Sequence, residues 1–334
     1  MLPIRNRVAR FFIYLALSMY TVTMSFPLLW AVLQSLKNVR QANSLIPVFI
    51  FKPTLESYAK LWFREVPENL PVLLLGAGAA SLALILLAVL LNRRGVSKLA
   101  VIGLVVVGFS VILWAIPRYA NTADWYDFFV NTLIVTVCSV TISVCFSAAA
   151  GYAIARYQRI GGAVILIVAL ALGSLPAMAF AMPYYQLSSM LGLQDSYILL
   201  IAVMVGLHQP FSIWMLRGFF LEIPRDIDES AMIDGASPFR VFWSVVAPIA
   251  WSGIITSALL NALGVYHSFL IVRVLTRNKW TLAVAMSKYV STLYAAEDTV
   301  PFAAAVSASI PLLILVFFCQ EQLIKGLGAG AVKG

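Results

Sequence analysis

The chain has 334 residues, of which 62% are apolar and only 11% are charged. A soluble domain is about 45–50% apolar and about 25% charged, and a soluble fold of this size cannot bury such an excess of apolar surface. The composition therefore excludes a soluble enzyme, a disordered chain and a nucleic-acid-binding module. In a chain surrounded by lipid, the formal charge of +9 reports membrane topology instead of a nucleic-acid partner.

Eight apolar stretches are long enough to cross a bilayer, for which a helix needs about 20 mostly apolar residues. Each is expected to be helical, because an isolated strand in lipid would leave backbone groups without hydrogen bonds. The expected spans cover residues 11–36, 70–91, 99–116, 129–155, 161–182, 197–217, 248–272 and 303–324. Prolines are expected to break or kink four of them, at Pro27, Pro176, Pro210 and Pro311.

Basic residues predict the orientation of these spans. Arginines at residues 5–10 precede the first span, which is too long for a signal peptide and is interpreted as a retained helix. Arg93 and Arg94 separate the second and third spans, whereas residues 184–196 contain no Lys or Arg. Because short loops rich in Lys and Arg stay in the cytoplasm, both termini are expected to be cytoplasmic.

Residues 218–248 depart from this pattern. They lie between two expected spans on the basic side, yet they carry a cluster of acidic residues. Pro224, followed by Asp226 and Asp228, predicts a helix start, because proline suits the first turn and acids suit the N-terminal dipole. Gly235 is the candidate residue for ending this helix.

A second short helix is predicted directly after Gly235. Ser237 and Pro238 form a typical helix start. Apolar residues then recur at helical spacing, namely Phe239, Phe242, Trp243 and Val246. A loop this structured and this apolar should bind a partner, and the alternative is a helix pair that lies on the membrane surface.

This segment resembles the cytoplasmic signature loop of binding-protein-dependent ABC importer permeases, which reads Glu-Ala-Ala, three residues, Gly, nine residues, Ile-x-Leu-Pro. Here Glu229-Ser230-Ala231 is followed after three residues by Gly235 and after nine more by Val245-Val246-Ala247-Pro248. The spacing matches without a gap, and the departures at Ser230, Val245 and Ala247 are small or conservative.

Other parts of the chain resemble the carbohydrate-uptake branch of this family. Residues 210–224 are similar to the run before the signature, and residues 131–132 and 149–156 are similar to the helix that opens the permease core. The Gly-rich tail, residues 325–334, resembles the ending of maltose-permease-type subunits. Together the resemblance covers residues 1–65 and 127–334.

The fold that follows from this resemblance is an all-α polytopic membrane bundle. Residues 1–65 would hold the first transmembrane helix and an external loop. Residues 127–334 would form the permease core, with the coupling loop at 218–248 and a cytoplasmic tail at 325–334. Because the usual subunit of this type has six spans, residues 66–126 are interpreted as an inserted helical pair, a peripheral scaffold that brings the total to about eight.

The resemblance also implies a transport subunit, not an enzyme, without catalytic, cofactor-binding or metal-binding residues. The sequence agrees, because it has no Gly-rich phosphate loop ending in Gly-Lys-Ser/Thr, so a partner ATPase would bind ATP and Mg²⁺. The implied partners are an ABC ATPase dimer, a second permease subunit (identical or different), an extracytoplasmic sugar-binding protein and membrane lipid, with no nucleic acid. The implied location is the bacterial cytoplasmic (inner) membrane.

The three cysteines are Cys138, Cys145 and Cys319. They lie inside apolar stretches without metal-ligand neighbours, so neither a disulfide nor a metal site is expected.

On the family pattern, six residues are expected to contact the ATPase: Glu229, Ser230, Ala231, Asp234, Gly235 and Pro248. The small side chains would permit close approach, and the two acids offer charge-assisted hydrogen bonds. The tail would add contacts to the ATPases from Lys325, Gly326 and Gly330, or would alternatively fray as a chain end.

Sugars are recognised by aromatic stacking and by neutral hydrogen-bonding groups. Residues with this chemistry occur in or beside the spans expected at 161–182, 197–217 and 248–272, and they are the candidates for a substrate path: Tyr184, Gln186, His208, Gln209, Asn261, Tyr266 and His267. Each could instead form bonds between helices or sit in the aromatic belt at the membrane surface.

Two other functions compete with import of a sugar or sugar-like polyol. An ion-coupled secondary carrier needs intramembrane carboxylates or a proton relay, and the expected spans have no central Asp or Glu, since Glu321 lies at a span end. An ABC importer for a non-sugar solute is the other alternative. A cation path would need acidic lining and an anion path basic lining, and the spans offer neither.

Overall fold

The computed structural model of the protein describes residues 7–157, 160–290 and 299–331. These residues form helices joined by short connections, with one isolated bridge between Phe63 and Thr122 and no strand. They separate into two compact units, formed by residues 1–126 with 288–307 and by residues 127–287 with 308–334.

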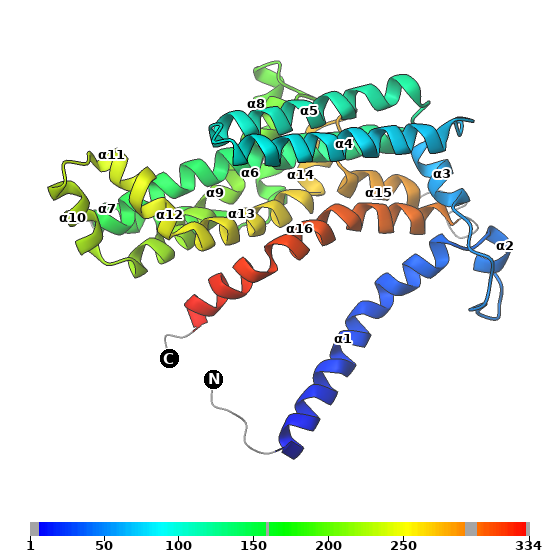
Figure 1. Cartoon of the computed structure of the whole chain (residues 1–334), viewed down its shortest axis with the longest axis horizontal. Helices are drawn as coiled ribbons and strands as arrows, with labels where there is room; N and C mark the ends of the chain where they lie inside the picture. The colour runs from blue at the N-terminus through cyan, green and yellow to red at the C-terminus, as the bar shows by residue number, and fades with distance from the viewer. Residues whose placement is uncertain (1–6, 158–159, 291–298, 332–334) are drawn as a thin grey trace. The chain divides into compact units, whose positions relative to one another are not determined.

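Within the described residues, the first unit contains five complete helices: α1 (Arg7–Ser35), α2 (Val39–Ala42), α3 (Glu56–Trp62), α4 (Leu70–Arg93) and α5 (Lys98–Tyr119). Helices α4 and α5 form a hairpin and lie side by side (Figure 1). Gly95 has a φ of 79° in the turn between them, a conformation that favours glycine. Leu84 of α4 fills the space above Gly108 of α5, where an added Cβ would lie 2.5 Å from it.

The chain enters and leaves the α4–α5 hairpin through segments that are hydrogen-bonded to each other. The Arg64 N–H donates to the Asn121 carbonyl at 2.8 Å, and the Ala123 N–H donates to the Trp62 carbonyl at 2.9 Å. The two ends of the hairpin therefore meet at its base, as they would in a segment inserted into a shorter connection.

The second unit contains most of the remaining helices: α6 (Asp124–Arg156), α7 (Ile160–Gly173), α8 (Ala177–Met190), α9 (Tyr197–Glu222), α10 (Arg225–Ile233), α11 (Pro238–Val241), a π-helical turn (Phe242–Val246), α12 (Ala247–Ile249), α13 (Trp251–Tyr266) and α14 (Leu270–Leu275). Residues of α6, α15 (Leu282–Val290) and α16 (Val300–Ala331) belong to both units. Helix α9 packs against both α7 and α13, so it is the central element of this unit.

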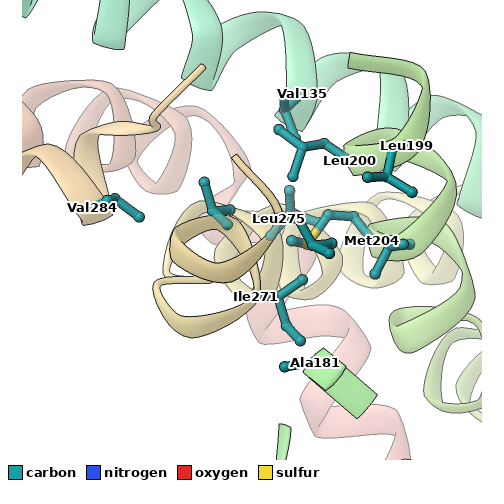
Figure 2. Packing of buried hydrophobic residues seen from close by; sticks show 11 residues of the cluster. Val135, Ala181, Leu199, Leu200, Met204, Ile271, Leu275 and Val284 are labelled. Atoms are coloured by element: carbon teal, nitrogen blue, oxygen red, sulfur yellow. The ribbon is translucent and has the colours of Figure 1, made fainter. Parts of the chain in front are cut away.

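An apolar cluster joins six helices of the second unit. Figure 2 shows Val135 of α6, Leu200 and Met204 of α9, and Ile271 and Leu275 of α14 converging in this cluster. Their neighbours include buried residues of α8, α13 and α15: Ala181, Val265 and Val284. Because these side chains are shielded by the helices of the unit, the cluster fixes how those helices pack together.

Among the described residues, five helices are long and apolar enough to cross a membrane, or seven if each of two bent pairs is one span. The remaining expected span corresponds to α5, which has a described apolar part at Gly103–Tyr119. Each of the eight expected stretches is thus helical, and the expected all-α polytopic bundle is confirmed.

The prolines do not act as expected in every span. Helices α1, α9 and α16 continue through Pro27, Pro210 and Pro311, whereas Pro176 separates α7 from α8 at a bend of 95°. Proline disfavours the helical conformation of the preceding residue, but neighbouring groups in a bundle can satisfy the carbonyl that it frees. The expected break is therefore found at one of the four prolines.

The span expected at 248–272 also differs from the structure. A bend of 80° separates the segment Pro238–Ile249 from α13, which begins at Trp251 and ends at Tyr266. The later residues of the expected span belong to a separate short helix, α14. The apolar run therefore spans parts of three helices, α12, α13 and α14, because hydropathy alone does not report a change of direction.

Candidate functional site

Helix α10 begins and ends where the sequence predicts. It follows Pro224 and carries Asp226 and Asp228 in its first turn. At its end Gly235 has a φ of 87°, its N–H donates to the Met232 carbonyl at 3.0 Å, and the next N–H donates to the Ala231 carbonyl at 3.0 Å. This pair of bonds is a Schellman motif, so the prediction that Gly235 ends the helix is confirmed.

Helix α11 also starts at the predicted residues. The Ser237 hydroxyl accepts a hydrogen bond from the Arg240 N–H at 3.4 Å, and Pro238 occupies the first position. A π-helical turn, Phe242–Val246, follows directly. Such turns are rare in proteins, and those that occur are often found at functional sites. We call α10 and α11 with their connecting turn, residues 225–241, the short-helix pair.

Arg156, the last residue of α6, binds Asp228 of α10 through a two-pronged ion pair. Its Nε lies 2.5 Å from Asp228 Oδ2, and its Nη2 lies 3.1 Å from Oδ1. The Tyr152 hydroxyl donates a third hydrogen bond to Oδ2 at 3.0 Å. The two charged side chains are only 10% and 5% exposed, so this is a buried ion pair with both carboxylate oxygens satisfied.

The same guanidinium holds the end of α9. Nη1 of Arg156 donates to the carbonyls of Phe220 and Ile223, each at 3.1 Å. These carbonyls lie where a helix terminus leaves backbone acceptors without partners. One arginine therefore ties together the ends of α6 and α9 and the start of α10.

Aromatic and aliphatic side chains surround this ion pair. Tyr152 packs against Phe220 in a T-shaped arrangement and against Phe242 at a tilt, with ring centroids 5.7 and 5.1 Å apart. Leu216, Phe220, Val241 and Val246 are buried in the same cluster. The low polarity of these neighbours strengthens the interaction between the two charges and excludes water from it.

A cavity of about 520 Å³ opens beside the ion pair. Its walls come from the last turns of α6, from α10 and from the aromatic side chains of Phe239, Phe242 and Trp243. Arg156, Arg225, Asp228 and Glu229 contribute its charged lining. Ile233, which is 86% exposed, is not part of this lining.

The structure places the six residues predicted for ATPase contact in two environments. Most are exposed along α10, at its end or in α12, namely Glu229, Ser230, Asp234, Gly235 and Pro248. Ala231 is instead half-buried and packs against the cluster around Tyr152. Contact with an ATPase by any of the six residues stays a prediction.

The ion pair of Arg156 and Asp228 joins the helices of this site. The sequence analysis did not predict this pairing. A weak signal existed, because Tyr152 and Arg156 are four residues apart and therefore share a face of α6. Their partner, Asp228, lies 76 and 72 residues further along the chain, at a distance where local patterns carry no information.

The predicted tail contacts fall in the last part of α16. Its backbone continues as a helix to Ala331, and the side chains of Lys325, Gly326 and Gly330 lie outside the described residues. The tail contacts therefore stay a prediction.

Two of the predicted substrate-path residues meet in a buried polar network. Asn261 of α13 donates to the hydroxyls of Ser143 at 2.7 Å and Ser212 at 3.1 Å, and Ser143 donates to Gln209 at 3.1 Å. This network joins α6, α9 and α13 through neutral hydrogen bonds. The Oδ1 of Asn261 is buried without a partner.

The other predicted path residues are dispersed. The Tyr266 hydroxyl donates to the Ala308 carbonyl at 2.6 Å, and His208 packs so closely on Gly264 that a Cβ there would lie 2.4 Å from its Nε2. Tyr184 packs against the apolar cluster of Figure 2. Gln186 and His267 are exposed. The structure thus brings Gln209 and Asn261 together, and a sugar contact by any of the seven stays a prediction.

A second polar anchor lies in the loop between α8 and α9. Asp195, with a φ of 56°, accepts the backbone N–H groups of Arg277, Asn278 and Lys279 at 3.0, 3.1 and 3.2 Å, and the Asn278 side chain at 2.8 Å. Burial alone would raise the pKa of Asp195, but these hydrogen bonds outweigh it and hold the pKa below its usual range. Asp195 therefore fixes the α14–α15 loop while charged.

These features define a multi-pass membrane protein with a structured pair of short helices set between two of its spans. Residues 143–328, which include the short-helix pair, match the family model described as "Binding-protein-dependent transport system inner membrane component". The chain belongs to this family and is a transport permease subunit. The resemblance to ABC importer permeases is thereby confirmed.

Similar proteins include two named as permeases of sugar transport systems. The chain is 31% identical over 229 residues to the maltodextrin transport system permease protein of Bacillus subtilis (strain 168), covering 66% of this chain and 81% of the relative. It is 31% identical over 208 residues to the trehalose transport system permease protein of Mycobacterium tuberculosis (strain CDC 1551 / Oshkosh), covering 61% of this chain and 76% of that protein.

The fold is also similar to a solved structure, described as the crystal structure of a bacterial ABC transporter involved in the import of the acidic polysaccharide alginate. The TM-score is 0.65 at 19% sequence identity, over 96% of this chain and 99% of that chain. At this identity the likeness establishes the fold.

Proposed function

We propose that this chain is the permease subunit of an ATP-driven importer for a neutral sugar or sugar-like polyol in a bacterial inner membrane. The observation that carries the proposal is the short-helix pair, which has the spacing of the family signature and is tied to two spans by a buried ion pair. The named relatives that transport maltodextrin and trehalose support the sugar assignment.

The exposed side of the short-helix pair is the docking surface in this proposal. Glu229 and Asp234 are exposed and can form charge-assisted hydrogen bonds to a partner, and Met232 and Ile233 offer apolar contact. A partner ABC ATPase dimer holds ATP and Mg²⁺, and its closure moves this surface. The attached spans then rock as rigid bodies to give alternating access.

The orientation follows from this docking surface. The short-helix pair and both termini face the cytoplasm, and the tail residues Lys325, Gly326 and Gly330 add contacts to the ATPases. The loop anchored by Asp195 then faces outward, toward an extracytoplasmic binding protein. A second permease subunit, of the same or a different sequence, completes the pathway.

The membrane interior favours a neutral solute. The buried network of Ser143, Gln209, Ser212 and Asn261 contains hydroxyl and amide groups only. An ion-coupled carrier would need carboxylates at mid-span, and in the described candidate spans the carboxylates lie toward the span ends, as Asp124, Glu222 and Glu321 illustrate. An importer for a cation is disfavoured for the same reason, and the buried network offers no basic group to an anion.

The experiment is purification of the affinity-tagged chain from its native membranes, followed by identification of the proteins that travel with it. We expect an ABC ATPase to co-purify and the complex, reconstituted in vesicles, to take up maltotriose or trehalose when ATP is supplied. Absence of any ATPase from the wild-type preparation would overturn the proposal.

Gly235→Asp tests the docking surface itself. This substitution strains the turn at a φ of 87° and changes the exposed end of α10, so ATPase binding and uptake should both fall. Gly192→Asp is the matched control, because Gly192 has a φ of 65° and equally open surroundings in the loop after α8. Equal effects of the two variants would show that backbone strain, and not docking, is responsible.

A further inference from the structure

A docking surface can move the spans only if it is firmly attached to them. The short-helix pair contains helices of nine and four residues, and helices this short are not stable by themselves in water. Their attachment must therefore come from tertiary contacts. In the described structure the guanidinium of Arg156 supplies two hydrogen bonds to Asp228 of this pair.

Arg156 makes four hydrogen bonds to two other elements. Two go to Asp228 of α10 and two to the carbonyls at the end of α9, while the side chain itself belongs to α6. Only the planar, five-donor fork of arginine can serve both groups at once. A lysine could meet the charge of Asp228 but could not cap the carbonyls in the same geometry.

Two neighbouring residues of α10 have different roles: Asp228 attaches the helix to the protein, and Glu229 is available to a partner. Asp228 is buried and fully bonded inside the protein, whereas the adjacent Glu229 is exposed. A partner that binds Glu229 would therefore pull on a helix whose preceding residue, Asp228, is bonded to Arg156 of α6 and, through Arg156, linked to the end of α9. Close packing of these helices extends the attachment, because a Cβ on Gly151 of α6 would lie 3.0 Å from the backbone nitrogen of Arg217 in α9.

We propose that Arg156 is a positioning residue that transmits motion of the short-helix pair to α6 and α9, through its simultaneous bonds to Asp228 and to the carbonyls of Phe220 and Ile223. This inference rests on the proposed function, because it assigns a route for the motion that a docked ATPase would impose. The role assigned to Arg156 requires no contact with solute or nucleotide. Its loss should uncouple ATP hydrolysis from transport without removing the docking surface.

The test compares four variants of the complete transporter in vesicles: Arg156→Lys, Arg156→Gln, Asp228→Asn and, as the matched control, Arg64→Gln, which breaks an exposed ion pair outside the short-helix pair. Three quantities are measured for each: the amount of ATPase that co-purifies, the rate of ATP hydrolysis, and the sugar taken up per ATP hydrolysed. The sugar probe is maltotriose or trehalose, whichever the wild-type complex transports.

We expect Arg156→Gln and Asp228→Asn to retain bound, active ATPase while uptake per ATP falls by roughly tenfold, within the range reported for residues that carry coupling between sites. Uptake per ATP in Arg156→Lys should fall almost as far, and Arg64→Gln should match the wild type. Should Arg156→Gln fail to accumulate, Arg156→Lys and Asp228→Glu carry the test, since both retain the charges.

Wild-type uptake per ATP in Arg156→Gln, or full activity in Arg156→Lys, would overturn the inference. So would loss of ATPase binding in parallel with uptake, because Arg156 would then only shape the docking surface. Failure of the wild-type chain to bind any ATPase is a different result, which would overturn the proposed function.

Discussion

The α4–α5 hairpin and the short-helix pair both expose large apolar side chains, such as Leu75 and Ile233, but different forces hold them. The hairpin is packed by aliphatic side chains, with Leu84 against Gly108. The short-helix pair has apolar contacts as well, but it is also held by the buried ion pair of Arg156 and Asp228. Aliphatic packing spreads stability over many small contacts, whereas a buried ion pair concentrates it in two residues. We therefore expect the α4–α5 hairpin to tolerate single substitutions better than the ion pair of Arg156 and Asp228.

The largest effect is expected from breaking the buried ion pair. Arg156→Gln leaves Asp228 buried without its partner, which should lower the free energy of unfolding by about 3–5 kcal/mol. The matched change is Arg64→Gln, because Arg64 pairs with Asp124 at 2.9 Å while 64% exposed. That change should cost about 0–1 kcal/mol. Denaturant titration in detergent measures both, and equal costs would show that the short-helix pair is not specially anchored.

The next largest effect is expected from overpacking. Gly151→Val would place its Cβ 3.0 Å from the backbone nitrogen of Arg217 and 3.2 Å from the carbonyl oxygen of Ile213, at a cost of about 1–3 kcal/mol. Gly76→Val in α4 meets nothing within 4 Å and should change stability by less than about 0.5 kcal/mol. Thermal unfolding of the two variants measures both stability changes. A larger loss of stability in Gly76→Val than in Gly151→Val would contradict the prediction.

A smaller effect on function is expected from removing the hairpin altogether. Deleting residues 68–120 with a short linker should leave ATP-driven uptake measurable. The flanking segments already meet, through the hydrogen bonds that link Arg64 to Asn121 and Ala123 to Trp62. Uptake by the shortened chain in vesicles is the measurement. Complete loss of uptake with normal accumulation and assembly would show that the hairpin has a part in transport.

The smallest effect is expected at Asp195, where a charge is held by backbone amides instead of an arginine. Because its pKa is lowered in the folded protein, the anchor is fully present above the unfolded pKa of about 3.9 and is lost as the pH falls through the lower folded value. Hydrogen exchange of the amides of residues 277–279 should therefore stay slow at pH 5. In Asp195→Asn these amides should exchange faster at that pH, and equal rates would contradict the anchor.

Much of the fold could be predicted from the sequence, because apolar length is sufficient to identify a membrane helix. The ends of α10 and α11 could also be predicted, since Gly235, Ser237 and Pro238 act through local backbone chemistry. The bend at Pro176 could not be distinguished from the continuous helices at Pro27 and Pro210, because the outcome depends on neighbouring helices.

The centre of the candidate site was not predictable in the same way. Arg156 and Asp228 meet only after three helices have packed, and no local spacing links them. The same holds for Asn261, whose partners Ser143 and Ser212 are 118 and 49 residues away. Sequence patterns indicated which segment faces a partner, and the structure was needed to show what holds that segment in place.

The most direct test of the central claim is the reactivity of a cysteine at Ile233, measured in membranes with and without the partner ATPase. Ile233→Cys, in a background without the native cysteines, should react rapidly with a maleimide when the ATPase is absent and be protected when it is present. Met190→Cys, which is equally exposed at the end of α8, should react alike in both preparations. Equal labelling of Ile233→Cys with and without the ATPase would contradict docking on the short-helix pair.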